Sequence, residues 1–433
     1  MVSTDIIIIG AGPGGYRAAE YAAKHGLKVT IFEGDNVGGT CLNVGCIPTK
    51  TYVHSASFAE ARERMAQVVP QLRSGVEGIL SHPNITLVRE KASFVNHGDC
   101  PSDSSEAKIK GTVPVILAGN ETYTAKNIII ATGSETKWLP IEGANDPCVV
   151  DSTGLLNLDT LPKRLCIIGA GVIGMEFASV FRRFGSEVTV IEFLKECIPA
   201  LDSDVAKRLR KLLEKRGITF HMKTAVQSLK DIDADVILMA TGRKPRTEGL
   251  NLEALGITLA RNGAIPVDDN FRVATVPAGY PAGLYAIGDV NGRQMLAHAA
   301  EMQAVRAVNH ILGQQDGIRF DIMPAAIFTE PEAACVGPTE DQLKEQGIAY
   351  ECRKSFWRAN GKALAMGEAE GMLKLFVATD DERILGCHAY GAHSADIVQE
   401  VAALMCRDTT ITQLRDIIHI HPTLGEILKA ATE

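Results

Sequence analysis

The sequence has 433 residues, 46% of them hydrophobic and 22% charged, which is long enough for several domains with separate cores. Its 44 basic and 52 acidic side chains give a net charge of −8 at pH 7, which argues against binding to nucleic acid. The apolar runs are strand-sized, as at residues 6–9, and shorter than the ~20 residues of a membrane span. The residues after Met1 do not follow the pattern of a secretory signal, and we expect a cytoplasmic protein.

The ten cysteines are too sparse for the disulfide scaffold of a small secreted protein. Most of them lie far apart and lack the spacing of metal ligands, so no metal site is expected. We expect eight to be buried, unreactive thiols. These are Cys100, Cys148, Cys166, Cys197, Cys335, Cys352, Cys387 and Cys406.

One internal repeat organises the chain. GAGPGGYRAAEYAAKHGLKVTIFE at residues 10–33 aligns without gaps with GAGVIGMEFASVFRRFGSEVTVIE at residues 169–192. Each copy follows a short apolar strand, runs through a helical stretch and enters a second strand rich in β-branched residues. The repeat therefore predicts two βαβ nucleotide-binding units of one type.

The remaining segments complete these units and add others. Apolar strands at residues 127–134 and 236–245 each contain Ala-Thr-Gly and are expected to close the two nucleotide domains. Residues 87–123 alternate in polarity, which predicts antiparallel strands with a solvated hairpin at residues 97–106. Helices are predicted at 297–312 and 394–406. From residue 323 onward, strands and helices alternate as in a separate α+β domain.

Both copies of the repeat carry the Gly-x-Gly-x-x-Gly pattern of a dinucleotide-binding turn. The glycines are Gly10, Gly12 and Gly15 in the first copy and Gly169, Gly171 and Gly174 in the second. Such a turn lets backbone amides approach a pyrophosphate at a helix N-terminus. Each second strand ends in an acid, Glu33 or Glu192, which is placed to bind ribose hydroxyls. Two bound dinucleotides are predicted.

The acid of the second copy also bears on the choice of nicotinamide cofactor. A carboxylate at Glu192 binds a free 2′-hydroxyl and repels a 2′-phosphate, which favours NAD over NADP. Arg182 and Arg183 leave NADP open, because cations on the same helix could meet that phosphate. A solvated helix face is the alternative interpretation of these two arginines.

A second motif, GGTCLNVGCIPTK at residues 38–50, contains Cys41 and Cys46. A straight helix would separate two residues at this spacing by about 7.5 Å along its axis, beyond the reach of a disulfide. We therefore expect the backbone to bend near Gly45. Close cysteine pairs in reducing compartments are more often redox-active than structural, and thiolates at helix starts are reactive. The segment thus favours a redox-active pair.

Near the end of the sequence, His421 precedes a proline and lies five residues before Glu426. This spacing lets the carboxylate orient the imidazole for general-base catalysis. From these residues alone, an ordinary packed or exposed histidine is the alternative. His419 is expected to have no catalytic role.

Residues 38–50, both glycine motifs, both Ala-Thr-Gly strands and HPTLGE at 421–426 together resemble the pyridine nucleotide–disulfide oxidoreductases. The resemblance covers nearly the whole chain. It implies an α/β fold with two three-layer, Rossmann-like domains and a C-terminal α+β dimerisation domain. The implied boundaries are an FAD domain at 1–145, an NAD domain at 146–262, a central domain at 263–320 that completes the FAD site, and a dimer-interface domain at 321–433.

The resemblance also implies roles for individual residues. Cys41 would exchange with substrate and Cys46 would face the flavin, His421 and Glu426 would handle the substrate proton, and Lys50 would lie beside the flavin and pair with Glu176. Helix-start packing is an equal alternative to flavin contact for His298. The implied FAD ligands are Gly10, Gly12, Gly15, Glu33, Gly39, Thr40, Lys50, Thr132, Gly133, Asp289, Ala297 and His298. The implied NAD ligands are Gly169, Gly171, Gly174, Glu176, Glu192 and Gly242.

By the same resemblance, the chain oxidises protein-bound dihydrolipoyl groups through a Cys41–Cys46 disulfide and FAD, and reduces NAD. The implied partners are a second copy of the chain in a homodimer and a lipoylated carrier protein or acyltransferase of a 2-oxoacid dehydrogenase or glycine cleavage system. A reductase of the glutathione reductase type is disfavoured by Glu192 and by Val172, which offers no aromatic gate. A non-catalytic flavin- and NAD-binding subunit would leave the cysteine pair and His421 unexplained.

Overall fold

The computed structural model describes residues 1–95, 115–275 and 283–433. The hairpin expected at residues 97–106 and Cys100 lie outside the described residues. The chain divides into two compact units, which are treated separately below. The first unit contains residues 1–51, 62–137 and 243–318, and the second contains residues 52–61, 138–242 and 319–433. The four domain boundaries expected from the sequence stay a prediction.

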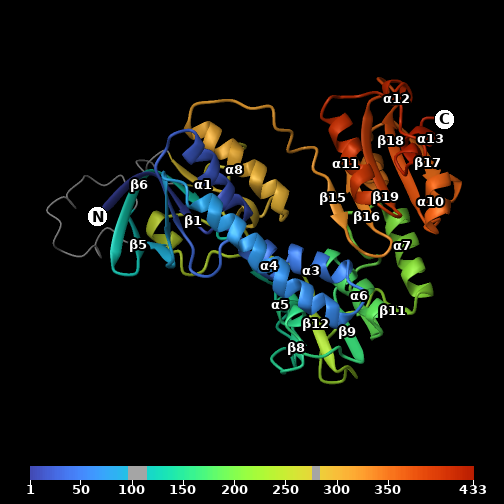
Figure 1. Ribbon diagram of the computed structural model, residues 1–433, viewed down its shortest axis with the longest axis horizontal. Coiled ribbons are helices and arrows are strands. Elements are labelled where there is room, and N and C mark those ends of the chain that lie inside the picture. The colour runs from blue at the N-terminus through green and yellow to red at the C-terminus, as the bar shows by residue number, and fades with distance from the viewer. Residues whose placement is uncertain (96–114, 276–282) are drawn as a thin grey trace. The chain divides into compact units, whose positions relative to one another are not determined.

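A seven-stranded sheet lies at the centre of the first unit (Figure 1). Its order is β3-β2-β1-β6-β5-β4, and β14 also pairs with β6. The pairs of β1, β2, β3, β6 and β14 are parallel, whereas β4, β5 and β6 pair antiparallel. The strands are β1 (Val2–Ile9), β2 (Val29–Phe32), β3 (Ile85–Val88), β4 (Ala92–Phe94), β5 (Val115–Ala118), β6 (Glu121–Ile130) and β14 (Leu284–Ala286). A separate two-stranded ribbon pairs β7 (Ser134–Thr136) with β13 (Arg243–Pro245).

Helices cover this sheet, and α1 lies beside α8 (Figure 1). The two helices approach closely because α1 presents small residues: a Cβ on Gly14 would lie only 3.3 Å from the carbonyl oxygen of Ala300. The helical segments are α1 (Pro13–Lys24), α2 (Gly39–Val44), α3 (Cys46–Val53), α4 (Phe58–Leu80), α8 (Ala297–Ile311), η1 (Leu252–Leu255) and η2 (Gly288–Asn291). The last residues of α3 and the first of α4 belong to the second unit.

The second unit contains a five-stranded parallel sheet in the order β11-β10-β9-β12-β8. Its strands are β8 (Val149–Val150), β9 (Arg164–Ile168), β10 (Glu187–Ile191), β11 (Ile218–His221) and β12 (Val236–Met239). Its helices are α5 (Ser152–Leu156), α6 (Val172–Phe184) and α7 (Ser203–Lys215). The strand–helix–strand order β9-α6-β10 repeats β1-α1-β2, so the two predicted βαβ units are confirmed.

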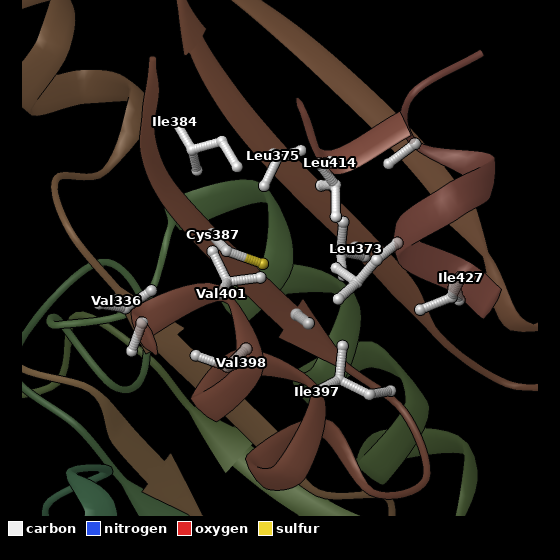
Figure 2. Close-up of a cluster of buried hydrophobic side chains, with 14 of the residues drawn as sticks. Val336, Leu373, Leu375, Ile384, Cys387, Ile397, Val398, Val401, Leu414 and Ile427 are labelled. Carbon is white, nitrogen blue, oxygen red and sulfur yellow. The ribbon is translucent and has the colours of Figure 1, made fainter. Parts of the chain in front are cut away.

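The C-terminal part of the second unit contains an antiparallel sheet in the order β15-β16-β19-β18-β17. The strands are β15 (Ala325–Ile327), β16 (Ala333–Val336), β17 (Tyr350–Phe356), β18 (Met372–Ala378) and β19 (Ile384–Tyr390). The helical segments are α9 (Glu340–Glu345), η3 (Trp357–Ala359), α10 (Gly361–Met366), α11 (Ser394–Met405), α12 (Ile411–Arg415) and α13 (Glu426–Ala430). Figure 2 shows Val398 and Val401 of α11 packed near Cys387 of β19 in the core of this α+β region.

The predicted fold class is confirmed, and the helices expected at 297–312 and 394–406 correspond to α8 and α11. The expectation that all eight remaining cysteines are buried is wrong for two of them. Cys148 lies in the loop before β8 and Cys406 follows the end of α11, and both are exposed because neither position faces a sheet or core. Cys352 is half-buried. Among the described residues, no helix is long and apolar enough to cross a membrane.

Candidate active site

The first glycine turn joins β1 to α1 and has no room for side chains. Gly10 has φ +102°, and a Cβ there would lie 2.4 Å from the carbonyl oxygen of Ala131. A Cβ on Gly15 would lie 1.9 Å from the carbonyl oxygen of Gly10. Gly12 is the N-cap of α1, and no side chain of the described residues caps this helix. The first amides of α1 are therefore available to a phosphate, as a dinucleotide site requires.

Glu33 follows β2 and closes this turn. Its Oε2 accepts a hydrogen bond of 2.8 Å from the amide of Ala11, in the middle of the glycine motif. Its Oε1 accepts one of 3.0 Å from the amide of Asp35. The carboxylate is thus fixed beside the glycine turn, where a ribose bound to the turn would meet it.

A cluster around Asp289 lies at the carboxyl ends of β6 and β14. The hydroxyl of Ser134 donates to Oδ2 of Asp289 at 2.5 Å, and Nε of Arg243 donates to the Ser134 hydroxyl at 2.7 Å. Burial raises the pKa of Asp289, and the bond from Ser134 and the charge of Arg243 oppose that rise. Gly133 has φ +73° and open space where a Cβ would lie. Sequence reasoning named Asp289 and missed Ser134 and Arg243.

The other residues predicted to hold FAD flank this cluster or the redox pair. Ala297 and His298 begin α8, with the imidazole of His298 exposed. Gly39 begins α2 with φ +59°, and a Cβ there would lie 2.7 Å from Cα of Gly12. Thr40 follows it, half-buried. This close approach brings the redox segment against the first glycine turn.

The redox segment bends where the sequence predicts. The helix α2 ends at Val44 and α3 begins at Cys46, with Gly45 between them at φ −134° and ψ −110°. A Cβ on Gly45 would lie 2.8 Å from the carbonyl oxygen of Thr40 and 3.3 Å from Cα of Cys41. The missing side chain at this bend therefore lets the two cysteines approach each other.

Cys41 and Cys46 are both free cysteines in this structure, and a hydrogen bond joins them. That hydrogen bond raises the pKa of Cys41 far above its usual value, and burial raises it further. Cys41 is half-buried, whereas Cys46 is exposed. The pKa shift therefore favours the protonated form of Cys41. The two cysteines thus differ in exposure, with Cys46 the more accessible.

The second glycine turn, between β9 and α6, repeats the first. Gly169 has φ +106°, and a Cβ there would lie 2.4 Å from the carbonyl oxygen of Ala240. A Cβ on Gly174 would lie 2.0 Å from the carbonyl oxygen of Gly169. Gly171 is the N-cap of α6, and no side chain of the described residues caps this helix. Gly242 has φ +105°, with open space where a Cβ would lie. This turn is a second dinucleotide cradle.

Glu192 occupies the same position in the second turn as Glu33 in the first. Its Oε2 accepts a hydrogen bond of 2.6 Å from the amide of Ala170, and its Oε1 accepts one of 2.7 Å from the amide of Leu194. The side chain is buried, with 9% of its surface exposed. A buried carboxylate at the ribose position favours a free 2′-hydroxyl.

Arg182 and Arg183, which could have favoured NADP, bind backbone carbonyls instead. Arg182 donates from Nε to the carbonyl of Arg216 at 3.0 Å. Arg183 donates from Nη2 to the carbonyls of Tyr52 and Val53, at 3.0 and 2.6 Å. Both guanidinium groups therefore bind carbonyl oxygens at helix C-termini, those of α7 and α3.

Glu176 and Lys50 belong to different units, so their predicted pairing stays a prediction. The Glu176 side chain is buried, with 3% of its surface exposed, on the second turn of α6. Its Oε1 accepts a hydrogen bond of 2.9 Å from the amide of Phe328. Lys50 is half-buried in α3, one turn after Cys46. Acidic side chains are rarely this buried, so the burial of Glu176 favours a functional role for its carboxylate.

The predicted dyad is present in the second unit. Nδ1 of His421 lies 3.0 Å from Oε1 of Glu426, and the amide of Thr423 donates to Oε2 of Glu426 at 3.0 Å. The bond from Thr423 and then that from His421 lower the pKa of Glu426. Because Glu426 holds Nδ1, Nε2 is the nitrogen that a substrate would meet. The imidazole is 79% exposed and open to such an approach.

A second histidine–glutamate pair lies two residues earlier, where sequence reasoning expected no role. Nε2 of His419 lies 3.1 Å from Oε1 of Glu400, and the His419 side chain is only 6% exposed. A Cβ on Gly425 would lie 3.7 Å from Cδ2 of His419. His419 therefore packs under the loop that presents His421. The partner, Glu400, lies on α11 and could not be found from local spacing.

Two dinucleotide cradles and a bent cysteine pair define a flavin-dependent dithiol–disulfide oxidoreductase. The chain belongs to the pyridine nucleotide-disulphide oxidoreductase family: residues 4–304 match that family, and residues 323–432 match its dimerisation domain. Its cofactors are FAD and NAD(H). Both turns fit such groups, because backbone blocks the Cβ positions of the first and last glycine of each motif, the middle glycine has open space, and the helices begin uncapped. Which turn binds which cofactor stays a prediction.

Relatives and solved structures agree with this family. Mitochondrial dihydrolipoyl dehydrogenase of Pisum sativum is 37% identical over 99% of this chain and 90% of its own length. Dihydrolipoyl dehydrogenase of Staphylococcus aureus is 35% identical over 100% of this chain and 96% of its own. The HOCl-induced flavoprotein disulfide reductase RclA from Escherichia coli has a similar structure, with a TM-score of 0.88 and 31% identity over 99% of both chains.

Proposed function

We propose that the chain is a dihydrolipoyl dehydrogenase, which oxidises protein-bound dihydrolipoyl groups and reduces NAD. The observation that carries the proposal is the Cys41–Cys46 pair, hydrogen-bonded across the bend at Gly45 and adjoining the first glycine turn. Similarity over nearly full length to dihydrolipoyl dehydrogenases supports the choice of substrate. The partner would be a lipoylated carrier protein or acyltransferase of a 2-oxoacid dehydrogenase or glycine cleavage system.

The proposed reaction begins with the pair as a disulfide. Nε2 of His421 takes a proton from one substrate thiol, while Glu426 on Nδ1 stabilises the imidazolium that forms. The substrate thiolate attacks the sulfur of Cys41, the Cys41–Cys46 bond breaks, and Cys46 leaves as a thiolate. The second substrate thiol then attacks the substrate sulfur of the mixed disulfide and releases the cyclic lipoyl disulfide. Cys41 leaves as a thiolate and takes up the proton that this second thiol gives up, consistent with its raised pKa.

FAD, when bound at the first turn, would supply the electron transfer from the reduced pair to NAD. Gly10, Gly12 and Gly15 would hold its pyrophosphate, and Glu33 its ribose. Asp289, oriented by Ser134, would bind the polar chain between phosphate and flavin. At the second turn, Glu192 would orient the ribose of NAD.

The test is oxidation of dihydrolipoamide by the purified protein with NAD, followed as NADH absorbance. We expect turnover with the wild type, and its loss by at least about a thousandfold in Cys41→Ser and in Cys46→Ser, because each removes half of the disulfide. Cys406→Ser changes an exposed cysteine outside the pair and serves as the matched control. If Cys46→Ser retained full dithiol oxidation, the proposal would be wrong.

The second candidate is a reductase that runs in the opposite direction, for which the similarity to RclA is the supporting observation. Separate assays with NADH plus lipoamide and with NADH plus glutathione disulfide distinguish the two. Faster turnover of glutathione disulfide than of lipoamide would favour this second candidate.

A further inference from the structure

The loop at residues 417–426 carries the His421–Glu426 dyad, and a second histidine attaches this loop to α11. Nε2 of His419 lies 3.1 Å from Oε1 of Glu400 on α11. We propose that Glu400 and His419 are positioning residues, which hold the loop so that Glu426 orients the His421 imidazole for the substrate dithiol. The inference rests on the proposed function, because it adds two residues to the proton-transfer step of that reaction.

Glu400 belongs to a helix that is held in place by packing. The apolar face of α11 lies in the core of the C-terminal region, where Ile397 and Val401 are 4% and 0% exposed (Figure 2). Glu400 lies between these two residues in sequence, and 38% of its side chain is exposed. The carboxylate therefore reaches the loop from an element whose own position is fixed by close packing.

The ring of His419 is oriented through both of its nitrogens. Nε2 faces the carboxylate of Glu400, and Nδ1 lies 3.3 Å from the carbonyl oxygen of Ile417. Only 6% of the His419 side chain is exposed, compared with 79% of the His421 side chain. One histidine is therefore the inner contact of the loop, and the other presents its imidazole at the surface of the protomer.

The same pair also lies against the other end of the loop. A Cβ on Gly425 would lie 3.7 Å from Cδ2 of His419 and 3.8 Å from Oε2 of Glu400. Gly425 is the N-cap of α13, and Glu426 is the first residue of this helix. The pair thus supports backbone two residues before His421 and backbone directly before Glu426. A shift of either end would change the direction from which Glu426 meets the imidazole.

Other hydrogen bonds hold the turn between these two ends. The hydroxyl of Thr423 donates to the carbonyl of Ile420 at 2.6 Å, and Nδ2 of Asn360 donates to the carbonyl of Thr423 at 3.1 Å. These bonds are independent of Glu400 and His419. When the contact between Glu400 and His419 is removed, we therefore expect the dyad to shift without unfolding of the domain.

Alanine and glutamine variants at both positions test the inference. Glu400→Ala and His419→Ala remove the contact and should lower kcat/KM for dihydrolipoamide about tenfold or more, because small misplacements of a catalytic group are costly. Glu400→Gln retains an acceptor for His419, and His419→Gln retains a donor for Glu400. Each glutamine variant should therefore recover most of the lost rate. Reduction of ferricyanide by NADH uses the bound cofactors without the dyad, so all four variants should retain the wild-type rate in that assay.

The matched control is Asp396→Ala. Asp396 lies one turn before Glu400 on the same helix and also pairs with a histidine, His393, at 3.4 Å, but 86% of its side chain is exposed. This variant should match the wild type in both assays. Wild-type kcat/KM in both Glu400→Ala and His419→Ala would overturn the inference while the proposed function stands. A loss that ferricyanide reduction shares, or that glutamine does not reverse, would also overturn it, because the pair would then have only a structural role.

If the wild type does not oxidise dihydrolipoamide, the proposed function fails, and a second measurement still tests the positioning. Diethyl pyrocarbonate acylates Nε2 of His421, and Glu426 makes that nitrogen more nucleophilic by accepting the hydrogen of Nδ1. The acylation rate at His421, followed by peptide mass spectrometry, should fall about threefold or more in Glu426→Ala and in Glu400→Ala. Asp396→Ala should leave it unchanged. A wild-type acylation rate in Glu400→Ala overturns the inference by itself.

Discussion

At the scale of single residues, Glu192 joins the second glycine turn to the end of β10 through two backbone amides. A 2′-phosphate next to this buried carboxylate would be repelled, so we expect kcat/KM with NAD to exceed that with NADP by at least about tenfold. Glu192→Gln should reduce the ratio about tenfold, which corresponds to about 1.4 kcal/mol. Initial rates with both cofactors under identical conditions measure it.

The control for this prediction is Glu187→Gln, which removes a charge from the exposed start of the same strand. Its ratio should equal that of the wild type. Equal efficiency with the two cofactors in the wild type would contradict the role of Glu192 and would return the glutathione reductase type to consideration.

A buried charge network in the second unit sets a pH dependence of stability. Nζ of Lys374 lies 2.7 Å from Oδ1 of Asp202 and 2.5 Å from Oε2 of Glu340, and its side chain is 1% exposed. Nδ1 of His388 accepts the amide hydrogen of Asp202 at 3.0 Å, and Nε2 donates to the carbonyl of Pro338 at 3.1 Å. Burial lowers the pKa of His388 to about 4. The network therefore requires a neutral imidazole.

This pKa gives the sign of the effect. The unfolded imidazole binds a proton near pH 6.5 and the folded one near pH 4, so the stabilisation is complete above pH 6.5 and is lost as pH falls towards 4. The difference corresponds to about 3 kcal/mol. In urea unfolding followed between pH 7 and 4.5, His388→Gln should remove most of this loss. The control His221→Gln, at an exposed position of β11, should lose stability with falling pH as the wild type does. If His388→Gln has the same pH slope as the wild type, other groups cause the loss of stability.

At the scale of elements, the bend between α2 and α3 depends on the absent side chain of Gly45. Gly45→Ala would bring a Cβ to 2.8 Å from the carbonyl oxygen of Thr40, and backbone cannot move aside as a flexible side chain can. The turn that carries Cys46 should shift away from Cys41, and we expect dithiol oxidation to fall at least about tenfold. Stopped-flow reduction of the disulfide by dihydrolipoamide measures the loss at the affected step.

A glycine on α4 provides the matched control. A Cβ on Gly75 would meet no described atom within 4 Å, so Gly75→Ala should leave turnover unchanged and stabilise the helix by up to about 1 kcal/mol. Wild-type rates in Gly45→Ala would show that the bend tolerates a side chain.

Local patterns predict those elements whose determinants lie close in sequence. The glycine turns, Glu33 and Glu192, and the bend at Gly45 follow from residue type and spacing, because tight turns and ribose acids require particular residues. Contacts between distant segments leave no such pattern. Arg243 reaches Ser134 across 109 positions, and His419 finds Glu400 on another helix, so only the folded chain reveals these partners.

At the scale of the whole molecule, the C-terminal region is the family's dimerisation domain, which indicates a homodimer. The loop that carries His421 also carries Ile418 and Ile420, whose side chains are 95% and 78% exposed. Apolar side chains this exposed on a dimerisation domain are expected to be covered by a second copy. We therefore predict that His421 of each protomer serves the Cys41–Cys46 pair of its partner, which produces two equivalent composite sites.

Subunit exchange tests this prediction. Cys46→Ser and His421→Ala should each be nearly inactive as homodimers, because every composite site then lacks one group. In a heterodimer of the two, one site carries both defects and the other carries neither, so mixing should restore activity, up to about one quarter of the wild-type value for equal amounts and random exchange. Mixtures of Cys46→Ser with Cys41→Ser are the control. Both variants damage the cysteine pair, so each site of their heterodimer has one defect and no activity should return. If each site were built from a single chain, both heterodimer sites would stay defective, and no recovery after exchange verified by native mass spectrometry would exclude the composite site.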